Sequence, residues 1–336
     1  MSDESAKEGN VFPVLQVAEI ASEEAQCRWM IEGLWGASCV GLVGGAPKCC
    51  KSWTALEMAV SVASGTPCFG RYAVPERGKA LLYLAEDSLP VIRERVSALA
   101  AHRGLTIDAL DVHVIKAASM RLDLPADQKR LQETARELRP KLLVLDPLVR
   151  IHRIDENDAS QVSALLSYLR GLQRELDLSV VLVHHTRKNH SPGLQAGQGL
   201  RGSGDFHAWS DSALYLRRVR GALLLTIEHR AAASPDPLGL RLATGPHGPY
   251  LEMGEGIPQE EGEGKRAGLD AAVLETLEAS GPRTRSALRA ELGVKNERLG
   301  VILGRLEAQG RIERAREGWR RRNGNDQEEV VPRSPL

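Results

Sequence analysis

One short segment of the sequence has the residue types and spacing of a phosphate-binding loop. The segment GAPKCCKS runs from Gly45 to Ser52 and follows SCVGLVGG, an apolar run that predicts a buried strand. Main-chain N–H groups of the loop, together with the start of the helix predicted after it, would bind phosphates. The Lys51 ammonium would neutralise β- and γ-phosphates. The residues expected to contact the nucleotide are Gly45, Ala46, Pro47, Lys48, Cys49, Cys50, Lys51, Ser52 and Trp53.

The loop departs from the usual motif at Cys50, where the motif has glycine. If this position needs a positive φ, a cysteine is strained there by roughly 1–3 kcal/mol. The departure leaves open an interpretation in which the loop is decayed or coincidental. The motifs that follow it along the chain argue against that interpretation.

Two further apolar runs end in carboxylates. LLYLAEDS places Glu86 and Asp87 after a predicted strand, and LLVLD ends at Asp146. At the carboxyl edge of a parallel sheet, Glu86 would orient and deprotonate an attacking water, and Asp146 would hold Mg²⁺ together with the Ser52 hydroxyl. The alternative is that these carboxylates only cap helices. Asp87 or Ser88 is the expected N-cap of the helix that follows.

The run SVVLVHHT predicts another strand, which ends in adjacent histidines. Neighbouring residues of a strand face opposite sides, so His184 and His185 cannot both point into one site, which argues against a zinc pair. His185 is the expected sensor of the γ-phosphate, and the alternative is a core histidine. Arg201 lies in the Gly-rich loop that follows. It is an expected arginine finger, with a DNA contact or a solvated side chain as the alternatives.

Strands alternate with helices along most of the chain, and the strands are continuous apolar runs. This pattern predicts an α/β fold with a mainly parallel sheet that helices cover on both faces. Residues 14–36 show helix-like spacing with Trp29 and Trp35 as anchors. The 336 residues suggest two or three domains. The predicted boundaries are a disordered N-terminus at 1–13, an ATPase domain at 14–251, a linker at 252–268, a second domain at 269–322 and a disordered tail at 323–336.

Composition excludes several classes of protein. The 44 basic and 44 acidic residues balance, which argues against a histone-like coat on nucleic acid, and 4% aromatic residues argue against base-stacking platforms as the main device. Five cysteines, without C-x-x-C spacing, favour reduced thiols over a disulfide framework or a zinc site. We expect a cytoplasmic protein, because neither a signal peptide nor an apolar run of about 18 residues is present.

The segment 269–322 has more basic than acidic residues, and its pattern predicts three helices followed by a hairpin. This order resembles a winged helix, in which the third helix enters the major groove and the wing contacts phosphates. The candidate DNA contacts are Lys295, Asn296, Arg298, Arg316 and Arg320. A winged helix used for protein contacts is the alternative, and Arg305 is an expected solvated helix residue.

Five motifs, GAPKCCKSW, LLYLAEDS with RERVSAL, LLVLDPLVRIHRIDEND, VVLVHHTRK and GLRGSGDF, resemble in order and spacing the RecA-type ATPases similar to the RepA hexameric replicative helicases. The resemblance covers about residues 14–230. It implies a RecA-like core that forms a homo-oligomeric, hexameric ring and hydrolyses ATP with Mg²⁺ at subunit interfaces. The roles that it implies are Lys51 and Ser52 on phosphate and Mg²⁺, Glu86 as catalytic base, Asp146 at the metal, His185 as sensor and Arg201 as a finger in trans.

The sequence therefore favours an ATP-hydrolysing, DNA-associated motor, either a helicase or a DNA-remodelling ATPase. The competing hypothesis is a DNA-binding regulator in which ATP only switches assembly, with little or no hydrolysis. Cys50 favours the regulator, whereas Glu86 together with Arg201 favours the motor.

Overall fold

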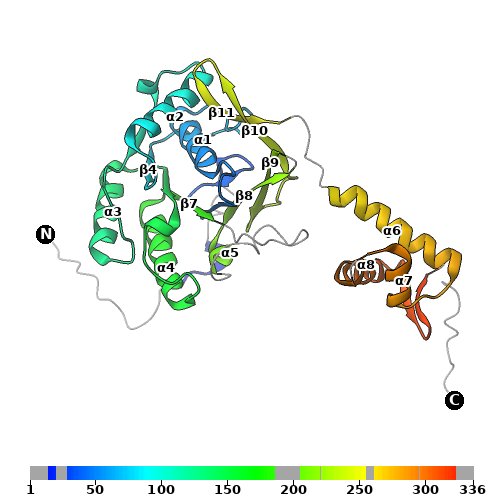
Figure 1. The fold of residues 1–336 in the computed structure, drawn as a ribbon. Helices are drawn as coiled ribbons and strands as arrows, with labels where there is room; N and C mark the ends of the chain where they lie inside the picture. Colours follow the sequence, from blue (N-terminus) through cyan, green and yellow to red (C-terminus); the bar gives the residue numbers. More distant parts are fainter. Residues whose placement is uncertain are drawn as a thin grey trace. The chain divides into compact units, whose positions relative to one another are not determined.

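The computed structural model describes residues 14–19, 29–185, 205–219, 221–254, 261–294 and 296–322, without the side chains of residues 261–268, 297, 298 and 301. The chain divides into two compact units, Met1–Pro258 and Gln259–Leu336 (Figure 1). Each unit is described by itself.

The first unit is built on a large sheet, which has nine strands within the described residues, in the order β11-β10-β9-β8-β3-β7-β6-β4-β5. Strands from β8 through β5 in that order run parallel, whereas β9, β10 and β11 extend the sheet antiparallel from β8. The strands are β3 (Val40–Gly45), β4 (Ala80–Leu84), β5 (Val112–Val114), β6 (Leu142–Asp146), β7 (Ser179–His185), β8 (Ser212–Val219), β9 (Ala222–His229), β10 (Leu238–Gly245) and β11 (Gly248–Met253).

Helices connect the parallel strands, and this arrangement confirms the predicted α/β class. A small antiparallel hairpin of β1 (Trp29–Ile31) and β2 (Trp35–Gly36) precedes the sheet in sequence. The helices are α1 (Lys51–Ser64), α2 (Leu89–His102), α3 (Pro125–Leu138), α4 (Ala159–Leu176) and α5 (Asp205–Trp209), with short 3₁₀ turns η1 (Val17–Glu19), η3 (Ile107–Ala109) and η4 (Leu148–Arg150).

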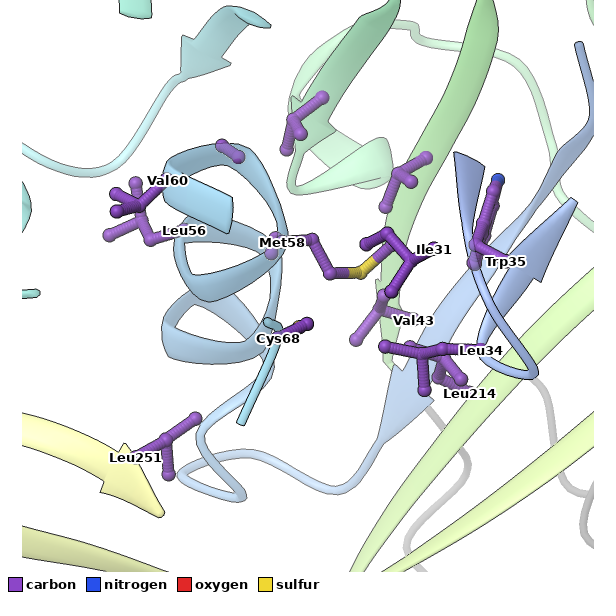
Figure 2. Close-up of a cluster of buried hydrophobic side chains, with 14 of the residues drawn as sticks. Ile31, Leu34, Trp35, Val43, Leu56, Met58, Val60, Cys68, Leu214 and Leu251 are labelled. Carbon is purple, nitrogen blue, oxygen red and sulfur yellow. The ribbon is translucent and has the colours of Figure 1, made fainter. Parts of the chain in front are cut away.

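Apolar side chains fill both faces of the sheet. On one face, Met58 of α1 extends toward Ile31 and Val43, in a cluster that also includes residues of α2, β9, β10 and β11 (Figure 2). On the other face, α3, α4 and α5 pack against alternate residues of the same strands, such as Leu42 of β3. Because both faces are covered, the parallel strands are mainly apolar, and most of their polar residues lie at the strand ends.

Strand β3 lies between β7 and β8, and two of its glycines lie where the main chain of β8 leaves no room for a side chain. A Cβ at Gly41 would lie 1.7 Å from the carbonyl oxygen of Ser212, and one at Gly45 would lie 2.4 Å from that of Leu216. Glycine is therefore required at both positions by close main-chain approach. The phosphate-binding loop thus starts from a strand that is tightly held on both sides.

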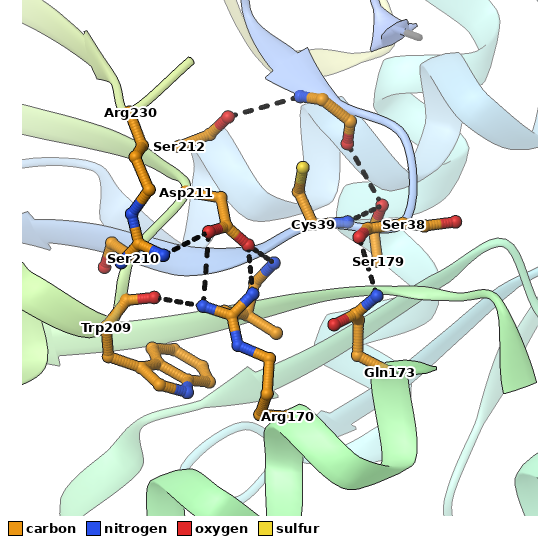
Figure 3. Close-up of polar contacts among 12 residues, drawn as sticks. Ser38, Cys39, Arg170, Gln173, Ser179, Trp209, Ser210, Asp211, Ser212 and Arg230 are labelled. Carbon is orange, nitrogen blue, oxygen red and sulfur yellow. Dashed lines mark hydrogen bonds and ion pairs between the residues drawn. The ribbon is translucent and has the colours of Figure 1, made fainter. Parts of the chain in front are cut away.

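A polar network holds the amino ends of β3 and β8 together (Figure 3). The Asp211 carboxylate accepts hydrogen bonds from the Arg170 guanidinium and, at 3.2 Å, from the Val40 N–H, and it pairs with Arg230 at 3.1 Å. Arg170 also donates a hydrogen bond to the Trp209 carbonyl, and its guanidinium lies 5.6 Å from the centroid of the Trp209 ring. The network joins α4 and the end of β9 to the two strands that position the loop.

The structure differs from the sequence prediction at the start of the first unit. Residues 29–36, expected as part of a helical segment, form β1 (Trp29–Ile31) and β2 (Trp35–Gly36). Trp35 is fully buried, as expected of an anchor, and it stands on a hairpin. The prediction of a helix is wrong here because a short hairpin and an amphipathic helix place apolar residues at similar spacings.

The sheet also continues beyond the strands that the sequence predicted. Strands β10 and β11 follow β9, and β11 returns to α2, where Tyr250 stacks on His102 with ring centroids 3.6 Å apart. These strands mix apolar residues with glycine and proline, which obscures their alternation.

The second unit has, in its described part, helices α6 (Glu261–Ser280), α7 (Arg285–Leu292) and α8 (Asn296–Ala308), followed by the hairpin of β12 (Ile312–Ala315) and β13 (Gly318–Arg321). Leu274, Leu288, Leu303 and Trp319 are among the residues of its apolar core. Residues 252–253 belong to β11 and 261–268 to α6, so the expected linker at 252–268 is shorter than predicted.

A buried ion pair connects α1 to the end of α2. The Glu57 carboxylate accepts hydrogen bonds from the Arg103 guanidinium and, at 2.8 Å, from the Phe69 N–H. Arg103 also donates to the Leu99 carbonyl at 2.7 Å and to Thr66 Oγ1 at 3.1 Å. Burial raises the pKa of Glu57, and the charge of Arg103 opposes that rise. The pair therefore depends on both partners, because an unpaired carboxylate at this depth is costly.

We expect Arg103→Met to lower the free energy of unfolding by about 3–5 kcal/mol, because it leaves Glu57 buried without its cation. Urea unfolding of the wild type and the variant measures the difference. Arg136→Met is the matched control, since it breaks an exposed pair with Glu175 and should change stability far less. Equal losses in the two variants would contradict the importance of burial for the Glu57–Arg103 pair.

Candidate nucleotide site

The loop between β3 and α1 has a left-handed backbone at two residues that are not glycine. Residues 46–50 connect Gly45 at the end of β3 to Lys51 at the start of α1. Cys50 has φ 58° and ψ 27°, and Lys48 has φ 64°, so both are left-handed without being glycine. Each such residue costs about 1–3 kcal/mol. The position of Cys50 does need a positive φ, and the cysteine is strained there.

The Lys51 side chain folds back over the loop that it follows. Lys51 is 5% exposed, and its Nζ donates a hydrogen bond to the Ala46 carbonyl at 2.8 Å. Burial lowers the pKa of Lys51, and nearby groups that include Asp146 and Glu86 oppose this decrease. A bound phosphate would favour the charged ammonium in the same way. The side chain is thus held over the loop whose main-chain N–H groups would bind phosphate.

Asp146 ends β6 as a buried carboxyl group next to α1. It accepts a hydrogen bond from Ser52, and its pKa is raised to about 6, mainly by burial. The charges of Asp87 and Glu86 also raise this pKa, whereas Ser52 and Lys51 lower it. A carboxylate and a hydroxyl are oxygen ligands that suit Mg²⁺, which is usually held by one or two such groups together with substrate phosphates. Asp146 and Ser52 therefore fit the metal site that the sequence predicts.

Glu86 and Asp87 follow β4 at the same edge of the sheet. Leu84, the last residue of β4, is the register partner of Asp146, so Glu86 lies two residues beyond it. The Glu86 carboxylate accepts a hydrogen bond from Arg150 Nε at 2.8 Å, and Asp87 pairs with Arg95 at 2.5 Å. Glu86 is available to act on a water, provided that Arg150 releases it.

The two histidines lie at the end of β7, next to the start of the loop. His184 is the register partner of Gly44 and His185 that of Gly45. His184 is 2% exposed, and its ring lies 5.0 Å from that of Phe206, on the face covered by α4 and α5. Alternation along the strand gives His185 the opposite direction. The register places His185, the expected sensor, beside the phosphate-binding loop.

Some expected site residues lie outside what the structure describes. Arg201 and Lys295 are outside the described residues, as is the side chain of Arg298. Asn296 begins α8, and its carbonyl accepts a hydrogen bond from Arg285 at 2.6 Å. The roles assigned to these residues from the sequence therefore stay predictions.

The remaining candidates of the second unit differ in how their charges are engaged. Arg316 is exposed in the turn between β12 and β13. Arg320 donates to the Glu313 carboxylate at 2.6 Å, which neutralises much of its charge. Arg305 pairs with Asp270 at 2.5 Å, so it is held by an ion pair rather than freely solvated.

Sequence reasoning missed three arginines around the loop. Arg150 binds Glu86, Arg95 lies over the Trp53 ring at 5.4 Å, and Arg218 donates to the Lys48 carbonyl. Each comes from an element that is distant in sequence from its partner. Arg95 and Arg150 stand inside two of the quoted motifs, RERVSAL and LLVLDPLVRIHRIDEND, but their partners are distant in sequence and only the fold brings them together.

The parallel sheet, with β7 between the loop strand β3 and the Asp146 strand β6, and the site at its carboxyl edge define a RecA-like P-loop ATPase. The chain belongs to the AAA domain family, whose model matches residues 5–191.

Solved structures similar to this chain include a DnaB-like replicative helicase, studied with its interactions with primase. That match has 17% identity and a TM-score of 0.47, and it covers 64% of this chain and 57% of the helicase chain. The RadB recombinase is similar at 15% identity and a TM-score of 0.48, with 65% of this chain and 92% of that chain covered. The chain therefore spans little more than half the length of the helicase that it matches.

No helix in the described part of the chain is long and apolar enough to cross a membrane. Within the same ranges, Cys39, Cys49, Cys50 and Cys68 are thiols that form no disulfide with one another.

The pKa of Asp146 predicts how metal-dependent nucleotide binding varies with pH. A proton competes with Mg²⁺ for the Asp146 carboxylate. Because the pKa is about 6, the protonated fraction of Asp146 grows as the pH falls below that value. The gain in ATP affinity on adding Mg²⁺ should therefore shrink about tenfold between pH 7 and pH 5. Titration of a fluorescent ATP analogue with and without Mg²⁺ measures this gain.

Asp146→Asn is the control, because ATP itself titrates in this range. Any pH dependence that the wild type shows and the variant lacks is due to the titration of Asp146. The same pH profile in both proteins would show that Asp146 does not bind the metal.

Proposed function

We propose that this protein is an ATP-hydrolysing, DNA-associated motor, a helicase or DNA-remodelling ATPase similar to the RepA hexameric helicases. The observation that carries the proposal is the meeting of Lys51, Ser52, Asp146 and Glu86 at the carboxyl edge of one parallel sheet. This set contains a cation for phosphate, oxygen ligands for a metal and a carboxylate for a water. Phosphoryl transfer needs little more than such positioning and charge.

In this proposal each residue has a definite task. The N–H groups of the loop and of the first turn of α1 bind the phosphates, and Lys51 leaves the Ala46 carbonyl to neutralise them. Ser52 and Asp146 would hold Mg²⁺, and the bound ion would supply positive charge against the phosphates. Glu86, released by Arg150, orients the attacking water and accepts its proton. His185 senses the γ-phosphate.

Ring assembly and DNA binding are also parts of the proposal. The resemblance to RepA-like ATPases supports a hexameric ring in which Arg201 reaches the nucleotide of a neighbour. The order of three helices and a hairpin in the second unit supports a winged-helix DNA-binding domain. Asn296 at the start of α8 and Arg316 in the exposed turn are its best-placed described contacts, together with the predicted Lys295 and Arg298. Arg320 would first have to leave Glu313.

The competing function is an ATP-switched DNA-binding regulator with little hydrolysis. Two observations favour it: Cys50 is strained in the loop, and Glu86 is held by Arg150. The two functions agree on ATP binding and differ in turnover, so a steady-state ATPase assay separates them.

We expect the wild-type protein to hydrolyse ATP and single-stranded DNA to stimulate the reaction. Lys51→Ala should abolish turnover and weaken ATP binding at least about tenfold, because it removes the cation that closes over the phosphates. Titration with a fluorescent ATP analogue measures the affinity, and circular dichroism shows whether the variant is folded. ATP binding without turnover in the wild type would favour the regulator, whereas unchanged affinity in folded Lys51→Ala would refute the proposed site.

Arg201→Ala tests the shared site predicted from the sequence. A finger acts where charge develops in the transition state, so ATPase activity should collapse while nucleotide affinity changes only a few-fold. Mixing this variant with Lys51→Ala should restore some activity, since a Lys51→Ala subunit can donate its Arg201 to an intact loop. Absence of rescue in a mixture shown to co-assemble would count against a finger in trans. Normal ATPase with loss of DNA binding would assign Arg201 to DNA.

A further inference from the structure

Arg218 lies beside the phosphate-binding loop although it is far from that loop in sequence. Strand β8 pairs with β3 up to Leu216 opposite Gly45, and Arg218 comes two residues later. Its Nε and Nη2 donate to the Lys48 carbonyl at 3.4 and 3.3 Å, and its Nη1 donates to the Gly221 carbonyl at 3.1 Å. The guanidinium therefore bridges the loop and the turn between β8 and β9.

The part of the loop that Arg218 holds is the part with the least favourable backbone. Lys48 and Cys50 both have positive φ, and neither is glycine. Side chains oppose this backbone, so a loop of this sequence without further support would spend less time in the phosphate-binding conformation. The Arg218 contact falls on the carbonyl of Lys48, one of the two strained residues.

Arg218 also lies close to the second strained residue. Burial raises the pKa of the Cys50 thiol, and the charge of Arg218 is the largest influence that opposes this rise. Cys50 is half-buried and packs against the apolar cluster beneath α1. The guanidinium and the apolar packing thus hold the loop from two sides.

We propose that Arg218 is a positioning residue that keeps the phosphate-binding loop in its nucleotide-binding conformation, and so compensates for the cysteine that stands at position 50 where the motif has glycine. The proposal rests on the proposed function only in that the loop binds ATP. Arg218 acts through the backbone of the loop and needs no contact with the nucleotide. Its effect is to raise the fraction of molecules that are competent to bind, which raises the apparent affinity by the same factor.

The test is a double-mutant cycle between Arg218→Ala and Cys50→Gly, followed by titration of a fluorescent ATP analogue. In the wild-type background Arg218→Ala should weaken binding at least about threefold, because the loop loses hydrogen bonds at a strained carbonyl. In the Cys50→Gly background the same change should cost less than about twofold, since glycine populates the left-handed conformation by itself. Cys50→Gly alone should raise turnover, because glycine relieves the strain of the left-handed backbone at this position.

A positioning role also predicts how the kinetic constants respond. Arg218→Ala should raise KM for ATP in the ATPase assay and leave kcat within about twofold, because the chemistry of a correctly bound nucleotide is untouched. Arg241→Ala is the matched control, since Arg241 is an exposed arginine of β10 paired with Glu252. It should change neither constant. Arg218→Met keeps the aliphatic length without the donors and replaces the alanine variant if that variant does not fold.

Three results would overturn the proposal. Equal losses of affinity in the wild-type and Cys50→Gly backgrounds would mean that Arg218 does not compensate for the cysteine at position 50. Unchanged affinity in the wild-type background would mean that the loop does not need the contact, and a collapse of kcat would place Arg218 in the chemistry. Failure of the proposed function is distinct from all of these, because the wild-type protein would then bind ATP without turnover or not bind it at all, and the cycle of affinities requires only binding.

Discussion

The confinement of β3 between β7 and β8 is the constraint on which the rest of the site depends. Gly41 and Gly45 have no room for a Cβ because carbonyl groups of β8 approach them. Strand β3 is also paired along its length with β7 and β8, so main-chain contacts hold it on both sides. The loop therefore leaves the sheet at one place and in one direction. The Asp211 network fixes the opposite ends of the same strands, and α1 can then begin directly behind the loop.

The charged groups of the site form hydrogen bonds and ion pairs within the protein itself. Lys51 donates a hydrogen bond to the Ala46 carbonyl, Arg150 donates one to Glu86, and Arg95 forms an ion pair with Asp87. ATP binding would exchange these internal contacts for contacts with phosphate and metal. The affinity then reflects the difference between two sets of interactions, so groups that never touch ATP can still influence it.

Local patterns predict most of the central sheet and fail at its margins. Continuous apolar runs mark β3, β4, β6 and β7, because strands that are buried on both faces are apolar except at their ends. The same reasoning assigns residues 14–36 to a helix, since a two-stranded hairpin with buried tryptophans has no periodicity long enough to identify. It also misses β10 and β11, which lie at the edge of the sheet and mix apolar residues with glycine and proline.

The sequence by itself determined where the candidate site residues stand: the loop residues, Glu86, Asp146 and His185 end or follow strands whose apolar runs predict their common edge, and their chemistry is a prediction. Only the tertiary structure decided the partners of these groups and the left-handed backbone of Cys50. Arg150 and Arg218 reach the site because the chain crosses between sheet positions, and Asp146 acquires its raised pKa from burial among neighbours distant in sequence. Such contacts depend on the order of the strands in the sheet, and local sequence patterns do not reveal that order.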